Sequence, residues 1–464
     1  MNTPLAVLIM IVAAFSLYLS RQRTQENGFF HGRSAEGDAP GLITLIFSQV
    51  TTWIFARSLL NAAILGFYYG IWGTLAYAAY YLSFFTGALI IDHLRFRQGH
   101  TSIQAFLHER FGHWGTRCYN LVIGVRLVSE VFANLLVIGI LFGVAGSQAY
   151  TLAVLAVSLV TLIYSMLGGL HASLRTDLFQ MLVFLAVLGL LLIFAVAGGH
   201  FSVALLDFKP FEISDPGPIL LLVALLQVWS YPMHDPVMMD RGFLADRRTT
   251  WRSFIHAGWI STLCILAFGS LGVIAGAGAF SGEDMNQALT RLLGEWPMLL
   301  FSATLVISAM STLDSTLSSS AKLVVMDMKL VPARVNNGRI AMVLFMLLGL
   351  ALVFWGNKDL FSAVAVSGTA SMYLAPVIFF SLWDNQRDIP LWSYLGSFVV
   401  ALGGAVLYFT ESSGYSALLG EAHKYTKLLW ISLAVLVIGC LMFQIGSLSA
   451  RRPRPSDSRM QVQP

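Results

Sequence analysis

The 464-residue sequence is 57% hydrophobic and only 11% charged, whereas an average soluble domain has roughly 25% charged residues. Its net charge of +4 comes from Lys and Arg residues spread over many segments, so no nucleic-acid-binding face is indicated. The chain has no GxxxxGK or HExxH motif, and its three cysteines show no disulfide or metal spacing, which argues against an ATP-driven pump, a metalloprotease and a transition-metal site.

Apolar runs of 17 or more residues recur along the chain, each long enough to cross a hydrocarbon core about 30 Å thick as a helix. They lack period-two alternation and are too long for strands, which excludes a membrane β-barrel. The sequence therefore predicts an all-α membrane protein with about 13 transmembrane helices. The expected spans are 4–20, 41–66, 70–92, 116–144, 149–167, 176–198, 215–239, 253–280, 297–325, 338–356, 358–383, 391–410 and 427–448.

Charge asymmetry sets the expected orientation. Residues 1–5 carry no basic residue and no small-residue cleavage site precedes Arg21, so the first span is expected to be a retained helix. With the N-terminus outside, the intracellular segments hold 19 Lys and Arg residues and the opposite side holds five. This predicts a multi-pass protein of a bacterial inner membrane, with a transmembrane domain over 1–448 and a cytoplasmic tail over 449–464. The intracellular segments are 21–40, 93–115, 168–175, 240–252, 326–339, 384–390 and 449–464.

Two spans carry features that an ordinary membrane helix avoids. Span 215–239 contains Pro232 and Pro236 with His234 and Asp235 between them, which indicates either a kink with two snorkelling polar groups or an unwound segment. Span 41–66 contains Arg57 but no Gly or Pro within 42–65, so composition does not mark a break there.

These two spans begin two sets of five, 41–198 and 215–383. Since five is odd, the sets are expected to be inverted repeats, and paired broken helices in such repeats surround a site near the bilayer midplane.

A single face of span 297–325 carries hydroxyl groups at positions 308, 311, 312, 315 and 319, which follow helical periodicity. Hydroxyl oxygens suit a hard cation such as sodium, although Ser and Thr also line close helix contacts. Asp314, beside them, favours the ion site.

Arg126 and Glu130 lie one helical turn apart in span 116–144. They are either a structural ion pair or, with Arg57, groups that orient a charged solute, because guanidinium matches carboxylate in a forked geometry.

At this point the sequence resembles the sodium:solute symporter family, which includes bacterial proline, sialic acid and galactose symporters. The segments that carry the resemblance are FFHGRS (29–34), HLRFR with FLHERFG (93–112), YSMLGGL with TDLFQ (164–180), PVMMDRGFLAD (236–246) and MSTLDS (310–315).

The resemblance implies a LeuT-like core of 5+5 inverted repeats and three groups of site residues. The sodium-binding residues are Thr51, Ile54, Ser308, Ser311 and Thr312. A second ion site, for sodium or a proton, consists of Asp177, Asp314 and Ser315. The substrate-binding residues are Arg57, Ser58, Arg126, Glu130, Gln227 and Tyr231.

The predicted function is that of a secondary transporter, not an enzyme, which couples inward sodium movement to uptake of a small anionic or zwitterionic solute by alternating access. Sodium is the coupling ion, no cofactor is expected, and the partners are the solute, sodium and the lipid bilayer rather than nucleic acid. The alternatives are a proton-coupled symporter and a membrane-embedded solute sensor with the same fold. The sequence does not determine the oligomeric state.

Overall fold

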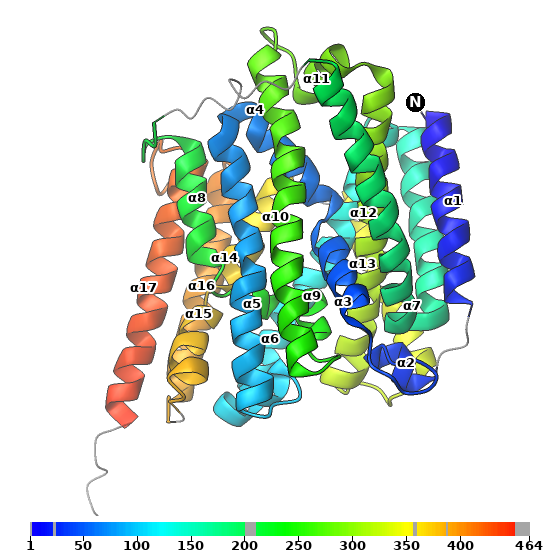
Figure 1. The fold of residues 1–464 in the computed structure, drawn as a ribbon. Coiled ribbons are helices and arrows are strands. Elements are labelled where there is room, and N and C mark those ends of the chain that lie inside the picture. The colour runs from blue at the N-terminus through cyan, green and yellow to red at the C-terminus, as the bar shows by residue number, and fades with distance from the viewer. Residues whose placement is uncertain (1, 22–24, 200–209, 356–359, 387, 451–464) are drawn as a thin grey trace, which may run out of the picture.

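The structure is a computed structural model that describes residues 2–21, 25–199, 210–355, 360–386 and 388–450. All regular secondary structure in these ranges is helical (Figure 1). Ten of the helices are long and apolar enough to cross a membrane, which confirms the predicted all-α membrane protein. Most of the predicted tail, 449–464, lies outside the described residues.

The helices are, in chain order, α1 (Asn2–Ser20), α2 (Glu26–His31), α3 (Leu42–Trp53), α4 (Ala56–Ala79), α5 (Ser83–Ile91), α6 (Ile103–Phe142), α7 (Gln148–Ala197), α8 (Pro216–Gln227), α9 (Pro236–Arg241), α10 (Arg247–Gly278), α11 (Met285–Leu293), α12 (Glu295–Lys322), α13 (Val335–Trp355), α14 (Leu360–Ser371), α15 (Leu374–Pro376), α16 (Leu391–Ser412) and α17 (Lys424–Ala450).

Two continuous helical stretches, Gln148–Ala197 and Ala56–Arg97, each correspond to two of the predicted spans. α7 has 50 residues and would measure about 75 Å if straight, more than twice the thickness of the hydrocarbon core. Its backbone departs from helical geometry at Gly169 (φ 57°, ψ −140°), and α4 does the same at Gly70 (φ 60°, ψ −146°). A Cβ on Gly73 would collide with the carbonyl of Leu65, so the chain folds back at Gly70. Each of these two reversals adds one span to the ten helices, and the interrupted span that contains α8 and α9 adds a third. Ten helices therefore correspond to thirteen predicted spans.

The first break separates α3 from α4. Ile54 and Phe55 have non-helical backbone angles, so span 41–66 is broken although no Gly or Pro marks it. Side chains from three other elements take up the freed backbone groups. Asn134 Oδ1 accepts from the Ala56 N–H (3.2 Å), and the Tyr81 hydroxyl donates to the Trp53 carbonyl (3.0 Å). The Ser308 hydroxyl donates to the Ile54 carbonyl. Tertiary partners therefore replace the missing helical bonds, as the bilayer requires.

The second break separates α8 from α9 and contains one short 3₁₀ turn, Pro232–His234. Its freed carbonyls are also bonded by side chains from other elements. Thr86 Oγ1 donates to the Val228 carbonyl (2.7 Å), and the Tyr119 hydroxyl donates to the Met233 carbonyl (2.7 Å). His234 is fully buried, so the interpretation of a simple kink with snorkelling polar groups is wrong.

The two breaks lie against each other. The rings of Trp53 and Tyr231 are 5.7 Å apart and nearly perpendicular, and Trp53 Nε1 donates to Asp235 Oδ2 at 2.9 Å. This meeting of two interrupted helices agrees with the predicted pair of repeats. The repeat boundaries, 41–198 and 215–383, stay a prediction.

The segments predicted to share the basic end of the molecule are in contact. Arg95 donates to the Gly242 carbonyl (2.7 Å), Arg339 to the Met166 carbonyl (2.8 Å) and Arg110 to Asn385 Oδ1 (2.6 Å). α2 belongs to this end, and Figure 1 shows α11 at the opposite end. Segments 93–115 and 240–252, and segments 93–115 and 384–390, are therefore neighbours in the fold, and the orientation in the membrane stays a prediction.

α4 and α10 pack with their backbones in direct contact. A Cβ on Gly272 would collide with the Ala63 carbonyl, and one on Gly276 with the Phe67 carbonyl. Small residues at such positions let two membrane helices approach more closely than side chains would allow.

Replacing Gly169 by Ala should destabilise the protein, since the positive φ alone costs a non-glycine residue about 1–3 kcal/mol. The new Cβ would also lie 2.5 Å from the Phe29 carbonyl oxygen. The expected result is a lower melting temperature of the purified protein in detergent.

The matched control is Gly189→Ala on the same helix, where nothing lies within 4 Å of the new Cβ. That change should leave the melting temperature equal or higher, because Ala favours a helix by up to about 1 kcal/mol over Gly. Equal melting temperatures for both variants would contradict the assignment of Gly169 as a required turn.

Candidate ion and solute site

A network of four charges joins the two breaks to α6. Arg57 Nη2 donates to Glu130 Oε1 at 2.7 Å, Arg126 also contacts Glu130, and Arg126 Nη2 lies 3.0 Å from Asp235 Oδ2. Trp53 Nε1 donates to the same Asp235 oxygen. Phe55, in the first break, has its ring 5.6 Å from the Arg57 guanidinium carbon and 5.4 Å from that of Arg126. Arg57, Arg126 and Glu130, predicted to lie together, do so.

All four charged side chains are at most 2% exposed. Two guanidinium groups and two carboxylates balance, so the network is neutral when every member is ionised. Several polar atoms nevertheless find no hydrogen-bond partner among the described residues: Arg57 Nε and Nη1, Arg126 Nε and Glu130 Oε2. Buried charged groups left partly unbonded are costly, which makes them candidates for contact with a ligand or water.

The remaining predicted substrate residues lie beside this network. The Tyr231 ring stands 5.8 Å from the Arg126 guanidinium carbon and 5.7 Å from the Tyr80 ring. Tyr80 donates its hydroxyl to Gln227 Oε1 (3.0 Å), and Tyr77 donates to Ser58 Oγ (3.3 Å). Gln227 and Ser58 therefore belong to an adjoining aromatic and polar layer rather than to the charge network.

The residues predicted for sodium divide between two places. A chain of two hydrogen bonds joins Ile54, Ser308 and Thr312. The Ser308 hydroxyl donates to the Ile54 carbonyl, and Thr312 Oγ1 donates to the Ser308 carbonyl at 2.9 Å. Thr51 is buried in the last turn of α3, just before the break. Ser311 instead donates to Asp177 Oδ1 at 2.8 Å.

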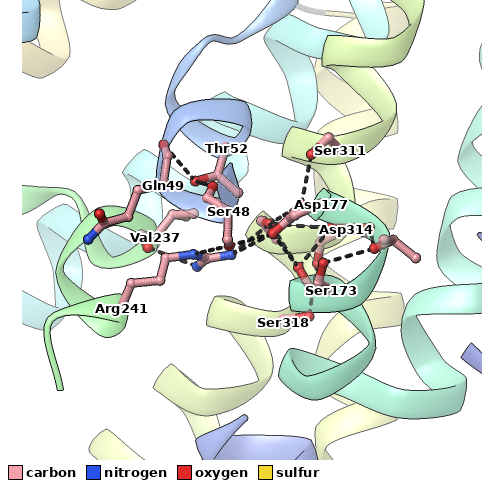
Figure 2. Close-up of polar contacts among 12 residues, drawn as sticks. Ser48, Gln49, Thr52, Ser173, Asp177, Val237, Arg241, Ser311, Asp314 and Ser318 are labelled. Carbon is pink, nitrogen blue, oxygen red and sulfur yellow. Dashed lines mark hydrogen bonds and ion pairs between the residues drawn. The ribbon is translucent and has the colours of Figure 1, made fainter. Parts of the chain in front are cut away.

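Asp177 and Asp314 form the centre of a second polar cluster (Figure 2). The Ser173 hydroxyl lies 2.9 Å from Asp314 Oδ1 and 3.5 Å from Asp177 Oδ2, so it bridges the two. Thr176 donates to Asp314 Oδ2 at 2.8 Å. Ser315 lies within hydrogen-bond distance of both carboxylates. The three residues predicted for a second ion site are thus in contact with one another.

Arg241 completes this cluster. Its Nη2 lies 3.4 Å from Asp177 Oδ2 and 2.8 Å from Ser315 Oγ, its Nε donates to Ser48 Oγ (2.9 Å), and its Nη1 to the Val237 carbonyl (2.8 Å). Arg241 belongs to the predicted intracellular segment 240–252, but its side chain is fully buried.

Three groups of the site were not predicted from the sequence. In the sequence, Asp235 stands out only as a polar residue between prolines, and Arg241 only as a basic residue of segment 240–252 and of a family motif. Trp53 carried no signal of its own. Two charged residues at apolar depth near a predicted break could have been flagged, since such groups need partners.

A separate cavity of about 1920 Å³ lies at the basic end of the molecule, and residues of α6 and α13 form part of its wall. Arg33, Arg95, Lys322 and Lys329 line it, and the predicted site residues do not. Lys322 pairs with Asp240 (2.7 Å) at its wall. Asp240 also accepts from the Ser319 hydroxyl (2.9 Å), so the Asp240–Lys322 pair stands between this cavity and the α12 hydroxyl face.

Changing Asp235 to Asn should lower stability, because it leaves two guanidinium groups to share Glu130. Breaking a buried ion pair by removing one partner costs about 3–5 kcal/mol. Melting of purified protein checks this.

The control is Asp215→Asn, at the N-cap of α8 on the same interrupted span, where the side chain makes no capping bond. It should melt like the unmodified protein. Equal melting of the Asp235→Asn variant would show that the charge network contributes no stability.

Comparison with known proteins agrees with this architecture. Residues 40–207 match the model of the sodium:solute symporter family, and no curated protein sequence matches the chain. Among solved structures, a Na⁺-coupled sialic acid symporter in a substrate-bound outward-open state aligns with a TM-score of 0.70 and 14% identity, over 95% of this chain and 97% of that one.

Two further structures share the fold. Mhp1, a nucleobase-cation-symport-1 family transporter in a closed conformation with bromovinylhydantoin, has a TM-score of 0.55 and 14% identity over 91% and 94% of the two chains. A manganese transporter of Eremococcus coleocola has a TM-score of 0.51 and 12% identity over 89% and 95%. The resemblance to the sodium:solute symporter family is therefore confirmed over residues 40–207. The aligned transporter structures confirm a multi-pass membrane protein with the predicted LeuT-like fold.

Proposed function

We propose that this chain is a sodium-coupled symporter, which moves a small organic solute inward together with sodium by alternating access. The observation that carries the proposal is the meeting of two broken helices around buried charges: Trp53 of the first break and Asp235 of the second share a hydrogen bond. Broken membrane helices persist where they line a binding site, since unwound backbone there can serve a ligand. The match of residues 40–207 to the sodium:solute symporter family supports the same function.

Sodium is proposed to bind between the first break and α12. Unwinding frees the Ile54 carbonyl, and Ser308 and Thr312 supply hydroxyl oxygens from one face of α12. Thr51 lies in the adjoining turn of α3. Oxygen ligands of this kind suit a hard cation. In the structure, the Ser308 hydroxyl donates to the Ile54 carbonyl and the Thr312 hydroxyl to the Ser308 carbonyl, so these oxygens already lie close together.

A sodium ion that bridges the break and α12 would stabilise one arrangement of the two. By linkage, solute binding to that arrangement and sodium binding raise each other's affinity equally. The membrane potential then supplies about 2.3 kcal/mol per charge for each 100 mV, in addition to the concentration gradient.

The solute is proposed to be a small zwitterion, such as an amino acid. The sequence favoured an anion or a zwitterion from two arginines and one glutamate, but Asp235 balances the second arginine. A solute without net charge leaves that balance intact. Its carboxylate could bond the unpaired nitrogens of Arg57, and its ammonium the unpaired Oε2 of Glu130.

The protein is proposed to lie in a bacterial inner membrane with the N-terminus outside. The contacts among the basic segments at one end of the fold support this orientation, because short cytoplasmic loops carry an excess of Lys and Arg.

Proton coupling is the nearest alternative, and one observation favours it. Asp177 pairs with one buried guanidinium, and Asp314 is joined to Asp177 through Ser173, so this cluster of two carboxylates and one guanidinium can bind a proton or a cation. Uptake by proteoliposomes under a sodium gradient at equal pH, compared with a pH gradient without sodium, separates the two. Uptake driven only by the pH gradient would refute sodium coupling.

Replacing Thr312 by Ala should raise the sodium concentration for half-maximal uptake at least tenfold, which corresponds to a loss of about 1.4 kcal/mol of binding free energy. The reason is the loss of one ligand oxygen from the proposed ion site. Sodium-dependent uptake of a transported solute into proteoliposomes measures it.

Thr304→Ala is the matched control, since Thr304 is also fully buried on α12 and donates its hydroxyl to a backbone carbonyl one turn earlier (2.6 Å). It should leave sodium dependence unchanged. If both variants behave alike, the hydroxyl face of α12 serves packing rather than ion binding.

Thermal melting in the presence of sodium should identify the class of solute. A ligand that binds only folded protein at 100 times its Kd adds about 2.7 kcal/mol of stability. Amino acids should raise the melting temperature, whereas carboxylic acids that lack the amine and neutral sugars should have smaller effects. A shift caused by sugars alone would contradict the zwitterion proposal.

A further inference from the structure

The side chain of Arg241, on α9, contacts three other helices: α3, α7 and α12. It is the last residue of α9, directly after the second break, and its Nε donates to Ser48 of α3, just before the first break. Its Nη2 contacts Asp177 of α7 and Ser315 of α12. One guanidinium thus connects α3 and α9, which flank the two breaks, to α7 and α12 (Figure 2).

The charges around it do not balance. Asp177, Asp314 and Arg241 are each fully buried. Arg241 pairs with Asp177, and Ser173 joins Asp177 to Asp314, so the cluster holds two carboxylates and one guanidinium. An uncompensated charge in such surroundings is strongly unfavourable, and the cluster therefore has room for one more positive charge.

The two oxygens of Asp177 face different partners. Oδ1 accepts from Ser311, on the hydroxyl face of α12 (2.8 Å), whereas Oδ2 accepts from Ser48 (2.6 Å) and faces Arg241 (3.4 Å). The Ser48 hydroxyl bridges the two charged groups, because it donates to Asp177 and accepts from Arg241 Nε. A cation held on the Oδ1 side therefore competes with Arg241 for the same carboxylate.

We propose that Arg241 is a tethered cation that neutralises Asp177, and that sodium held on the Oδ1 side of Asp177, beside Ser311, weakens this contact and so releases α3 and α9 from α7 and α12. The inference rests on the proposed sodium-coupled function. It assigns Arg241 the role of a positioning residue that sets both the sodium affinity and the coupling of ion binding to movement of the broken helices.

Removing the competing charge should tighten sodium binding. In Arg241→Gln, the sodium concentration that gives half of the maximal rise in melting temperature should fall at least tenfold, with potassium replacing sodium at constant ionic strength. Arg241→Lys keeps the charge but cannot reach Ser48 and Ser315 with a fork, so its sodium affinity should lie between those of the Gln variant and the unmodified protein.

The matched control is Arg95→Gln. Arg95 donates to the carbonyl of Gly242, the residue after Arg241, and so anchors the same segment through a backbone carbonyl instead of a carboxylate. Its sodium titration should stay within about twofold of the unmodified protein.

The outcomes are distinct. If the unmodified protein melts identically in sodium and potassium, the proposed sodium function fails, and this inference with it. If the unmodified protein responds to sodium but Arg241→Gln binds sodium with equal or lower affinity, Arg241 only holds α9 in place and the inference alone is overturned. If Arg241→Gln does not fold, Arg241→Lys decides: tighter sodium binding supports a competing cation, and equal or weaker binding overturns it.

Discussion

Every backbone polar group within a bilayer needs a partner, and this requirement explains most of the central architecture. The chain is interrupted at Ile54–Phe55 and again between Val228 and Asp235, where helical bonds are lost. Asn134 and Ser308 bond the first break, and Tyr119 bonds the second. Each partner comes from a helix distant in sequence. The interruptions are therefore stable only when the whole bundle has assembled. The freed backbone N–H and C=O groups are confined to the centre of the bundle.

Charge is balanced differently in the two buried clusters. Around the breaks, Arg57 and Arg126 meet Glu130 and Asp235 with equal numbers of each sign. Between α7 and α12, the cluster of Asp177 and Asp314 contains a single guanidinium, which pairs with Asp177. The first arrangement suits a ligand without net charge, and the second suits a cation. Charge balance thus divides the proposed solute and ion between neighbouring regions, although both clusters contact α3.

What the sequence predicted well was encoded locally. The spans follow from composition, the basic end from loop charges, and the hydroxyl face of α12 from periodicity. The break at Ile54 could not be predicted in this way, because its stabilising partners lie on other helices. Arg241 was assigned to a loop because it follows the predicted span 215–239 directly. In the structure it is the last residue of α9, and its side chain is buried in the helix bundle. Asp235 shows the same limit: only tertiary contact makes it a partner of Arg126.

The backbone contact of α4 with α10 has a mechanical consequence. With carbonyls of α4 lying against Gly272 and Gly276, neither helix can slide without collision, so the two should behave as one rigid body. α3 is covalently joined to that body only through Ile54 and Phe55. These two residues then form a hinge, and rotation of α3 about it would move Ser48 toward or away from Asp177. The lack of Gly or Pro there makes the hinge depend on its hydrogen-bonding partners rather than on a flexible backbone.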